Sequence, residues 1–376
     1  MNMSRELFKS YILPIAVFSG GMIGVGFLSL PYIASQVGIW WMIFCFAVIT
    51  ALVVGINLIF CKLTIKTPDF KRLPGFAGFY LGKWAKAVMM VSIILGTLGV
   101  LLAYLLVGGD FLKSAFAPVF SGNLLTYALI YFVIVSIVIY FDIKIISRTE
   151  FWVLLLILLA IFCVLLSGIP NLKLSNIFNS NFKSPISNLF LPYGALLFSL
   201  WGAGLMPEVE EMLRGQKAKL KKVVIISTIG TAVFYFLFMV LILGLTGNNT
   251  SPTALDGLTG AVPAPVVALS LLAGALATLA AFITQGIVLK KTLMFDLKIK
   301  HWQAFVMTCF TPMVFFLLGV KSFIPIISLV GGALLGLNGI LILLMYKKIG
   351  GKKIIIYPLS LIFILGIIYE LIYFAK

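Results

Sequence analysis

The chain has 376 residues, of which 62% are hydrophobic and only 10% are charged, and its mean hydropathy is +1.18. Soluble domains are about 45–50% apolar and about 25% charged, so this composition excludes a water-soluble enzyme, a disordered chain and a secreted disulfide scaffold. The net charge of +17 is typical of nucleic-acid binders, but the chain has too little polar sequence to form the surface such a protein needs. The composition therefore indicates a multi-pass membrane protein.

Long apolar runs follow one another along the whole chain. A bilayer core about 30 Å thick requires about 20 apolar residues per helix, and eleven runs approach that length. The first run is too long for a cleavable signal peptide, and the chain stays hydrophobic after it. The longest connections, near 62–84 and 170–186, leave no room for a soluble domain, so we expect one transmembrane domain over 1–376. The predicted spans are 11–34, 38–61, 85–108, 124–142, 150–169, 187–212, 223–246, 263–289, 302–320, 323–346 and 354–374.

The distribution of positive charge predicts the orientation of these spans. Cytoplasmic loops of membrane proteins carry an excess of Lys and Arg. With the N-terminus in the cytoplasm and alternating spans, 23 of the 28 Lys and Arg residues fall inside and five fall outside. We therefore expect a cytoplasmic N-terminus and an external C-terminus in a cell membrane, with the inner cations facing anionic lipid headgroups. The four cysteines have no metal-ligand spacing and are interpreted as small buried apolar residues.

Two spans contain helix-breaking composition in mid-membrane. The first has four glycines in seven residues, Gly20-Gly21-Met22-Ile23-Gly24-Val25-Gly26, followed by Pro31. The sixth has Trp201-Gly202-Ala203-Gly204, followed by Pro207. Each glycine costs a helix about 1 kcal/mol relative to alanine, and non-helical backbone persists in a membrane only where it lines a protein cavity. Both spans are predicted to be broken helices, although close helix packing is the alternative explanation for such glycines.

The two predicted breaks lie five spans apart, which places them in opposite orientations. Interrupted spans at equivalent positions of two halves indicate an inverted repeat around a transporter's central site. We expect a first repeat over about 11–169, a second over about 187–346, and an extra helix over about 354–374. Trp201 is the one tryptophan predicted in mid-span. It would line the cavity or, alternatively, pack in the core.

The sequence at the breaks resembles a known family. Gly24-Val25-Gly26-Phe27-Leu28-Ser29-Leu30-Pro31-Tyr32 resembles the first-helix G-x-G-[IL]-L-x-x-P-[YF] signature of amino-acid permeases, with Phe27 where that pattern has Ile or Leu. Gly96-Thr97 with Tyr104 to Asp110, and Pro207-Glu208-Val209, are similar to further stretches of the same group. The closest resemblance is to the amino acid/auxin permease family of the amino acid–polyamine–cation superfamily. It implies the LeuT-type inverted-repeat fold and secondary transport of amino acids by alternating access.

The resemblance also implies a substrate site. Freed backbone N–H groups around Gly24, Val25 and Gly26 would bind the carboxylate, because a helix start attracts anions. Carbonyls near Ser19 and Phe198 would receive the ammonium group. Gly20 replaces the polar Asn that relatives often carry at the start of the break. The implied substrate-binding residues are Ser19, Gly20, Gly21, Ile23, Gly24, Val25, Gly26, Tyr104, Phe198, Ser199, Trp201 and Gly202.

The coupling ion stays open at this point. The chain contains no ATP-binding motif, so Na⁺, H⁺ or exchange would drive transport, and no cofactor beyond a coupling ion is expected. The resemblance implies a possible Na⁺ site from the carbonyls of Gly20 and Ile23 and the hydroxyl of Thr278, although a lone Thr usually bonds its own helix. The acids fall near span ends or in loops, apart from three that begin the inner half of span six. Among them, Glu208 is either a solvated helix-end residue or the partner of Arg5 in an inner gate.

Three classes of function compete. A secondary transporter is the leading interpretation, and a non-transporting amino-acid receptor subunit on the same fold is the alternative. A polytopic enzyme is disfavoured, because no D-D-x-x-D, H-E-x-x-H or G-x-G-D motif occurs. We expect no acidic or basic side chain in the central cavity, which favours a small neutral or aromatic amino acid as substrate.

Overall fold

The computed structural model describes residues 8–67, 71–116, 119–141, 146–178, 188–213 and 216–374. Helices make up almost all of this part of the chain, and an isolated bridge joins Thr259 and Val262. In chain order, with η for 3₁₀ and π segments, the helices are η1 (Phe8–Ile12), α2 (Leu13–Met22), η2 (Val25–Ser29), α3 (Leu30–Val37), α4 (Ile39–Lys66), α5 (Leu73–Leu81), α6 (Lys83–Phe116), α7 (Leu124–Tyr140), α8 (Ile146–Gly168), η3 (Ile169–Asn171), α9 (Leu174–Phe178), α10 (Leu191–Leu200), η5 (Ala203–Leu205), α11 (Met206–Met212), α12 (Lys217–Thr246), η6 (Gly247–Asn249), η7 (Asp256–Leu258), α13 (Ala264–Phe295), α14 (His301–Leu317), α15 (Phe323–Leu329), η8 (Val330–Leu335), α16 (Gly336–Lys348) and α17 (Lys353–Phe374).

Each predicted apolar run coincides with a helix or with a group of consecutive helices. Within the described residues, six helices are long and apolar enough to cross a membrane, and the bent pair that forms the first run makes seven. Three shorter apolar helices occupy the fourth, fifth and ninth runs. The all-helical membrane fold is therefore confirmed, whereas the number of eleven spans, the repeat boundaries and the orientation stay predictions.

Both predicted breaks are present. The first run divides into α2, η2 and α3, with a bend of 54°. The sixth run divides into α10, η5 and α11. In each case a glycine lies in the non-helical backbone and a proline occupies the first turn of a following helix, namely Pro31 and Pro207. Proline suits that position because N–H groups in the first turn have no intrahelical acceptor, so the N–H that proline lacks costs no hydrogen bond.

A third irregularity was not predicted. The tenth run contains a π-helical segment, η8, between α15 and α16. Here Gly331 packs against the backbone carbonyl of Gly194 on α10, so two helix backbones approach with no side chain between them. The connection near 62–84 also contains the helix α5, because α4 continues to Lys66 and α6 begins at Lys83.

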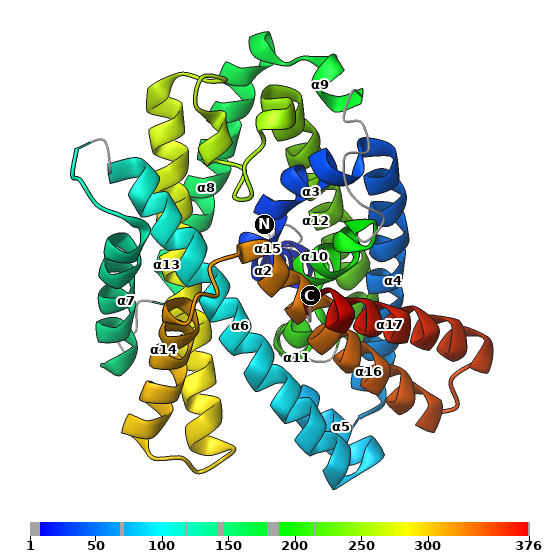
Figure 1. The fold of residues 1–376 in the computed structure, drawn as a ribbon. Coiled ribbons are helices and arrows are strands. Elements are labelled where there is room, and N and C mark those ends of the chain that lie inside the picture. The colour runs from blue at the N-terminus through cyan, green and yellow to red at the C-terminus, as the bar shows by residue number, and fades with distance from the viewer. Residues whose placement is uncertain are drawn as a thin grey trace.

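The packing places the broken helices among long, continuous ones. Figure 1 shows α6 crossing the molecule diagonally, with α7, α13 and α14 on one side and α16 and α17 on the other. Helix α13 packs along α6 and α8, and α12 packs along α2 and α4. Many large hydrophobic side chains of α17 are exposed on the surface, among them Leu365, Leu371 and Ile372.

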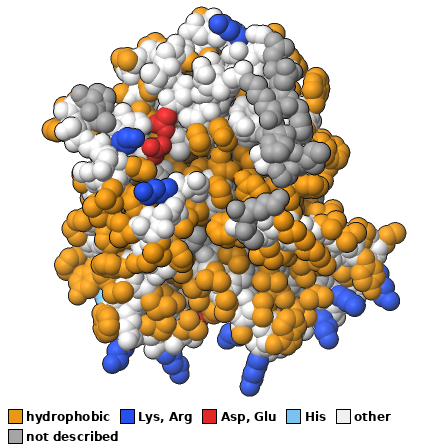
Figure 2. Space-filling model, viewed as in Figure 1, with side chains coloured by type: hydrophobic (Ala, Val, Ile, Leu, Met, Phe, Trp, Pro, Cys, Tyr) orange, Lys and Arg blue, Asp and Glu red, His pale blue; other side chains and the backbone are white. Residues whose placement is uncertain are grey.

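The surface agrees with a membrane-embedded protein. Hydrophobic side chains form a broad band over the visible face, and most of the visible Lys and Arg side chains lie beyond its lower edge (Figure 2). A contiguous apolar surface of this extent would associate in water, whereas in a bilayer it contacts the lipid tails.

We predict that the contact of η8 with α10 limits stability. In Gly331→Ala the added methyl group would overlap the Gly194 carbonyl oxygen and lie 2.8 Å from the Phe198 nitrogen. These are backbone atoms, so relief requires a helix to move, and such overpacking costs about 1–3 kcal/mol. Thermal unfolding of the purified protein in detergent should show a lower Tm.

The matched control is Gly230→Ala on α12, where an added methyl group meets nothing within 4 Å. This substitution should leave Tm unchanged or raise it, because alanine is the better helix former by about 1 kcal/mol. Equal shifts of Tm in the two variants would contradict the proposed importance of the η8–α10 contact.

Candidate functional site

The first break exposes backbone at the end of α2. The Ile23 N–H bonds to the Ser19 carbonyl at 3.1 Å and closes the last turn. Gly24 is then fully extended, with φ −128° and ψ −160°, before η2 begins at Val25. A helix end leaves backbone groups without intrahelical partners, so this stretch can offer both carbonyl and N–H groups to a ligand.

The second break has a similar form. Helix α10 ends at Leu200, and Trp201 is extended with ψ 110°. Gly202 leads into the single turn η5, and α11 begins at Met206. The Ser199 hydroxyl donates to the Ala195 carbonyl at 2.7 Å, so it is held within its own helix.

The two breaks pack directly against each other. A Cβ on Gly26 would lie 2.5 Å from Ser199 Oγ and 2.6 Å from Phe198 Cδ1. A Cβ on Gly202 would lie 2.6 Å from Phe18 Cε1. Any side chain at either glycine would therefore separate the two interrupted segments. The sequence predicted two paired breaks, and the structure shows the reason for glycine at these two positions.

Helix α6 brings Tyr104 to the same place. A Cβ on Gly24 would lie 3.1 Å from the Tyr104 hydroxyl, and the Tyr104 side chain is buried. The predicted site residues of the first, third and sixth runs are thus brought together around Gly24 and Gly26.

Burial around the breaks is one-sided. Gly21 and Gly204 are exposed, and Ser19, Gly20, Ile23, Gly24, Phe198 and Trp201 are half-buried. By contrast, every residue from Val25 to Leu30 is buried. The first break is therefore covered by packed residues on its α3 side, from Val25 to Leu30.

Tyr235 on α12 is a site residue that the sequence analysis missed. Its hydroxyl donates to the Met22 carbonyl at 2.8 Å, which satisfies a carbonyl at the first break. Its ring stacks on Phe27, with ring centroids 5.2 Å apart, and Phe234 and Phe238 also contact Phe27. The Phe at position 27, which departs from the permease pattern, is thus accommodated by aromatic residues of span seven. The run Phe234-Tyr235-Phe236 inside an apolar span was the available signal.

Thr278, the predicted hydroxyl ligand for a cation, lies on α13. It donates to the Ala275 carbonyl of its own helix at 2.8 Å. A Cβ on Gly108 would lie 2.7 Å from Thr278 Oγ1 and would overlap the Tyr131 ring. Thr278 is therefore buried at the contact of α13 with α6 and α7.

The predicted inner gate is only partly visible, because Arg5 lies outside the described residues. Glu208 is exposed in the first turn of α11, and Glu210 in the same helix is buried.

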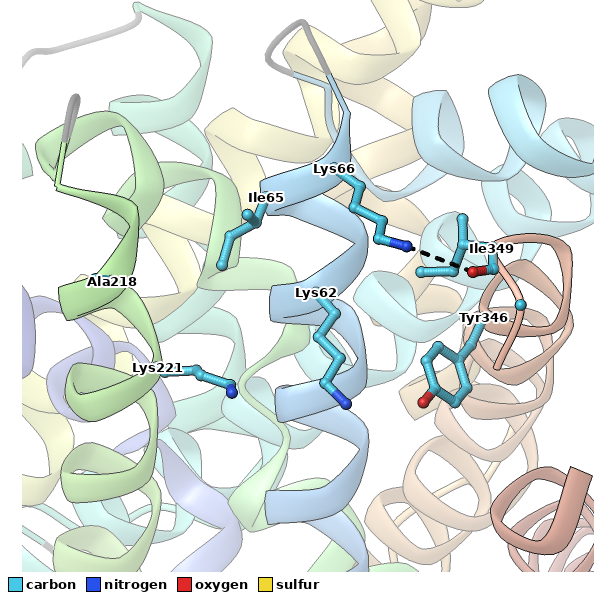
Figure 3. Close-up of a pocket in the computed structure, with 8 residues that line it drawn as sticks. Lys62, Ile65, Lys66, Ala218, Lys221, Tyr346 and Ile349 are labelled. Atoms are coloured by element: carbon cyan, nitrogen blue, oxygen red, sulfur yellow. Dashed lines mark hydrogen bonds between the residues drawn. The ribbon is translucent and has the colours of Figure 1, made fainter. Parts of the chain in front are cut away.

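A separate cavity of about 440 Å³ lies between the ends of α4, α12 and α16. Lys62 and Lys66 of α4 and Lys221 of α12 direct their side chains into it (Figure 3). Lys66 Nζ donates to the Ile349 carbonyl at 3.5 Å, and Lys62 Nζ lies 5.6 Å from the Tyr346 ring centroid. The cavity concentrates positive charge at one end of the molecule, away from the two breaks.

Comparisons with known proteins agree with this architecture. The sequence profile of the tryptophan/tyrosine permease family matches residues 8–357. No curated protein sequence matches the chain significantly. The structure is similar to MhsT in complex with L-phenylalanine, with a TM-score of 0.63 and 15% identity over 96% of this chain and 97% of that one.

Two further structures are similar. The inward-facing conformation of Mhp1 gives a TM-score of 0.69 and 14% identity over 96% of this chain and 89% of that one. A mutant manganese transporter of Eremococcus coleocola gives a TM-score of 0.67 and 14% identity over 97% and 86% of the two chains. At these identities the likeness concerns the fold.

The solved structures show the LeuT fold, and together with the family match they identify a multi-pass membrane protein that is a secondary transporter of amino acids. The chain belongs to the tryptophan/tyrosine permease family. The predicted resemblance to amino-acid permeases is confirmed at this level, whereas the narrower resemblance to amino acid/auxin permeases is not.

We predict that Tyr235 supports the first break. In Tyr235→Phe the Met22 carbonyl loses its partner, and leaving a buried polar group unsatisfied costs about 1–3 kcal/mol. Transport assays should show a raised KM together with a lower Tm.

Tyr127→Phe is the matched control, because the Tyr127 hydroxyl also donates to a backbone carbonyl, that of Phe120, at 2.6 Å. That bond lies outside the breaks, so the control should change Tm without changing KM. An unchanged KM in Tyr235→Phe would refute the supporting role.

Proposed function

We propose that the chain transports aromatic amino acids, with tryptophan and tyrosine as its main substrates. The observation that supports this most directly is the aromatic lining of the two breaks. Phe198 lies against Gly26, the Tyr104 hydroxyl lies against Gly24, and Trp201 is half-buried in the second break. Aromatic rings attract one another in offset or edge-to-face arrangements, so this lining suits an aromatic side chain.

The charge of the site supports the same proposal. Among the described residues of the two breaks, from Ser19 to Ser29 and from Phe198 to Leu205, none is charged. A lysine or glutamate substrate would bring an unpaired charge into this region, which is costly. A neutral amino acid brings only its carboxylate and ammonium groups, which backbone N–H and carbonyl groups of the breaks can receive.

The proposed roles follow from this geometry. Backbone N–H groups at Gly24, Val25 and Gly26 bind the carboxylate, helped by the start of η2 and α3. Carbonyls near Ser19, Gly20 and Ser199 receive the ammonium group. Tyr104, Phe198 and Trp201 enclose the side chain. Gly21, Ile23 and Gly202 provide the remaining walls. The family match and the similarity to a transporter in complex with L-phenylalanine support these roles.

The decisive variant is Gly26→Ala, tested by uptake of labelled tryptophan, tyrosine and phenylalanine into liposomes that contain the purified protein. The added methyl group separates Gly26 from Ser199 and Phe198. We expect substrate affinity to fall about tenfold or more, because overpacking costs about 1–3 kcal/mol and 1.4 kcal/mol corresponds to tenfold.

Gly55→Ala on α4 is the control, since its added methyl group meets nothing within 4 Å. Native uptake in Gly26→Ala would refute the site. Saturable binding by the native chain without any flux would instead favour the receptor-subunit alternative.

We also propose coupling to a cation, either Na⁺ or H⁺, entering with the substrate. The carbonyls of Gly20 and Ile23 and the hydroxyl of Thr278 are the proposed ligands for Na⁺, and Arg5 with Glu208 is the proposed inner gate. In liposomes, an inward gradient of the coupling cation should drive accumulation of substrate above its external concentration.

Thr278→Val tests the sodium assignment, because valine keeps the shape of the side chain and removes its oxygen. Thr278→Ser is the control, because serine retains the hydroxyl oxygen. Loss of Na⁺-driven accumulation in the valine variant alone would support the site. Accumulation driven by a pH gradient without Na⁺ would assign the coupling to H⁺, and equilibration under both gradients would exclude coupling.

A further inference from the structure

The last helix carries a carboxyl group into the protein interior. Glu370 on α17 is 1% exposed, and its Oε1 atom has no hydrogen-bond partner within the described structure. Its neighbours Leu371 and Ile372 face outward. The sequence analysis placed this acid at a span end and gave it no role, and the structure buries it against the second broken helix.

Glycines of two other segments make room for this carboxyl group. A Cβ on Gly194 of α10 would lie 2.5 Å from Glu370 Oε1, and a Cβ on Gly332 of η8 would overlap the Glu370 side chain. One turn earlier on α17, Gly366 leaves space for the ring of Tyr193. The Glu370 side chain is therefore held where α10, η8 and α17 meet. In Figure 1 the C-terminal part of α17 reaches the centre of the molecule beside these segments.

Among the described residues, the surroundings of the carboxyl group include hydroxyl groups but no counter-ion. Tyr193 from α10 and Ser328 from α15 have buried hydroxyls without partners within the described structure. The titratable groups that interact electrostatically with Glu370 are Tyr193 from α10 and Tyr369 and Tyr373 from α17 itself. Segment η8 contributes Gly331 and Gly332, and α16 contributes Gly336, which lies against Ile367. Within the described chain, no lysine, arginine or histidine side chain acts on Glu370.

A buried lysine elsewhere in the protein provides a contrast. Lys290 on α13 is fully buried, and its ammonium group donates to the Ile139 carbonyl at 2.5 Å, near the end of α7. Carbonyls at a helix C-terminus attract a positive charge, so the Lys290 ammonium group has a partner that suits it. Glu370 has no comparable partner at Oε1 within the described structure, and a buried carboxylate without a counter-ion takes up a proton rather than staying charged.

We propose that Glu370 is a proton-binding site that holds α17 against α10 and η8. With the proton bound, the neutral carboxyl group fits among Gly194, Gly332 and Tyr193. Loss of the proton places a negative charge at this buried position. Solvation of that charge requires the contact between α17 and α10 to open to water. Because α10 carries Phe198 and Ser199 at its other end, the protonation of Glu370 controls the movement of the half-helix that bears the proposed substrate site.

The test compares the native chain with Glu370→Gln, which keeps the shape of the neutral acid and cannot ionise. The purified full-length protein is unfolded thermally in detergent without ligand, from pH 5 to pH 9. The folded native chain binds one more proton than the unfolded chain, so its stability falls as pH rises. Its Tm should drop relative to that of Glu370→Gln by on the order of 1–3 °C per pH unit.

Asp296→Asn is the control, because Asp296 is an exposed acid between α13 and α14. Its Tm should follow the native curve. Parallel curves for the native chain and Glu370→Gln would overturn the proposal. A second neutral variant, Glu370→Met, covers the case in which the amide itself is not tolerated. Failure of both neutral variants to fold, while Asp296→Asn folds, would show that the charged form is required and would also overturn it.

A transport measurement tests whether protonation of Glu370 controls the movement of α10. Exchange of labelled tryptophan is followed in liposomes with equal pH on both sides, so that no gradient drives it. The exchange rate of the native chain should vary with pH, whereas that of Glu370→Gln should not. The tryptophan concentration that gives half-saturation should differ less than about twofold between the two proteins. The same pH profile in both proteins would refute the control of α10. Absence of tryptophan exchange in the native chain would count against the proposed substrate and leave the unfolding test of Glu370 standing.

Discussion

The structure depends on one constraint: interrupted backbone inside a membrane must be covered by protein. Two helices are broken in this chain, and each break covers the other. Gly26 packs on Ser199 and Phe198, and Gly202 packs on Phe18. The Tyr235 hydroxyl satisfies a carbonyl that the first break leaves free. Because unsatisfied backbone groups are so costly in hydrocarbon, the remaining helices are arranged to keep this contact intact.

The same close packing explains how distant helices are connected to the site. Helix α10 contacts the first break at one end and contacts η8 and α17 near its start. The contact at Gly194 and Gly331 brings two backbones together, and the contact at Gly194 and Glu370 brings a carboxyl group to the same place. A shift of α10 must therefore disturb both ends at once, since packed interiors do not deform continuously.

A transporter of the LeuT fold alternates between arrangements that open to opposite sides. Here the backbone is exposed at Gly21 and Gly204 and buried from Val25 to Leu30, so one side of the site is closed by packed residues. The aromatic residues that surround the breaks, including Phe27 with its partners on α12, are in keeping with membership of the tryptophan/tyrosine permease family.

The sequence by itself determined the membrane class, the apolar runs and the two breaks, because length, hydropathy and clusters of glycine with proline are local properties. It also indicated Gly24, Gly26 and Tyr104 through recognisable motifs, and Trp201 through its position in mid-span. Only the tertiary structure decided the role of Tyr235, the π-helical segment η8 and the burial of Glu370. Each of these depends on which helix faces which, and the chain positions involved are separated by tens to hundreds of residues. An acid near the end of an apolar run looks solvent-exposed in sequence, and only the glycines of α10 and η8 show that it lies inside.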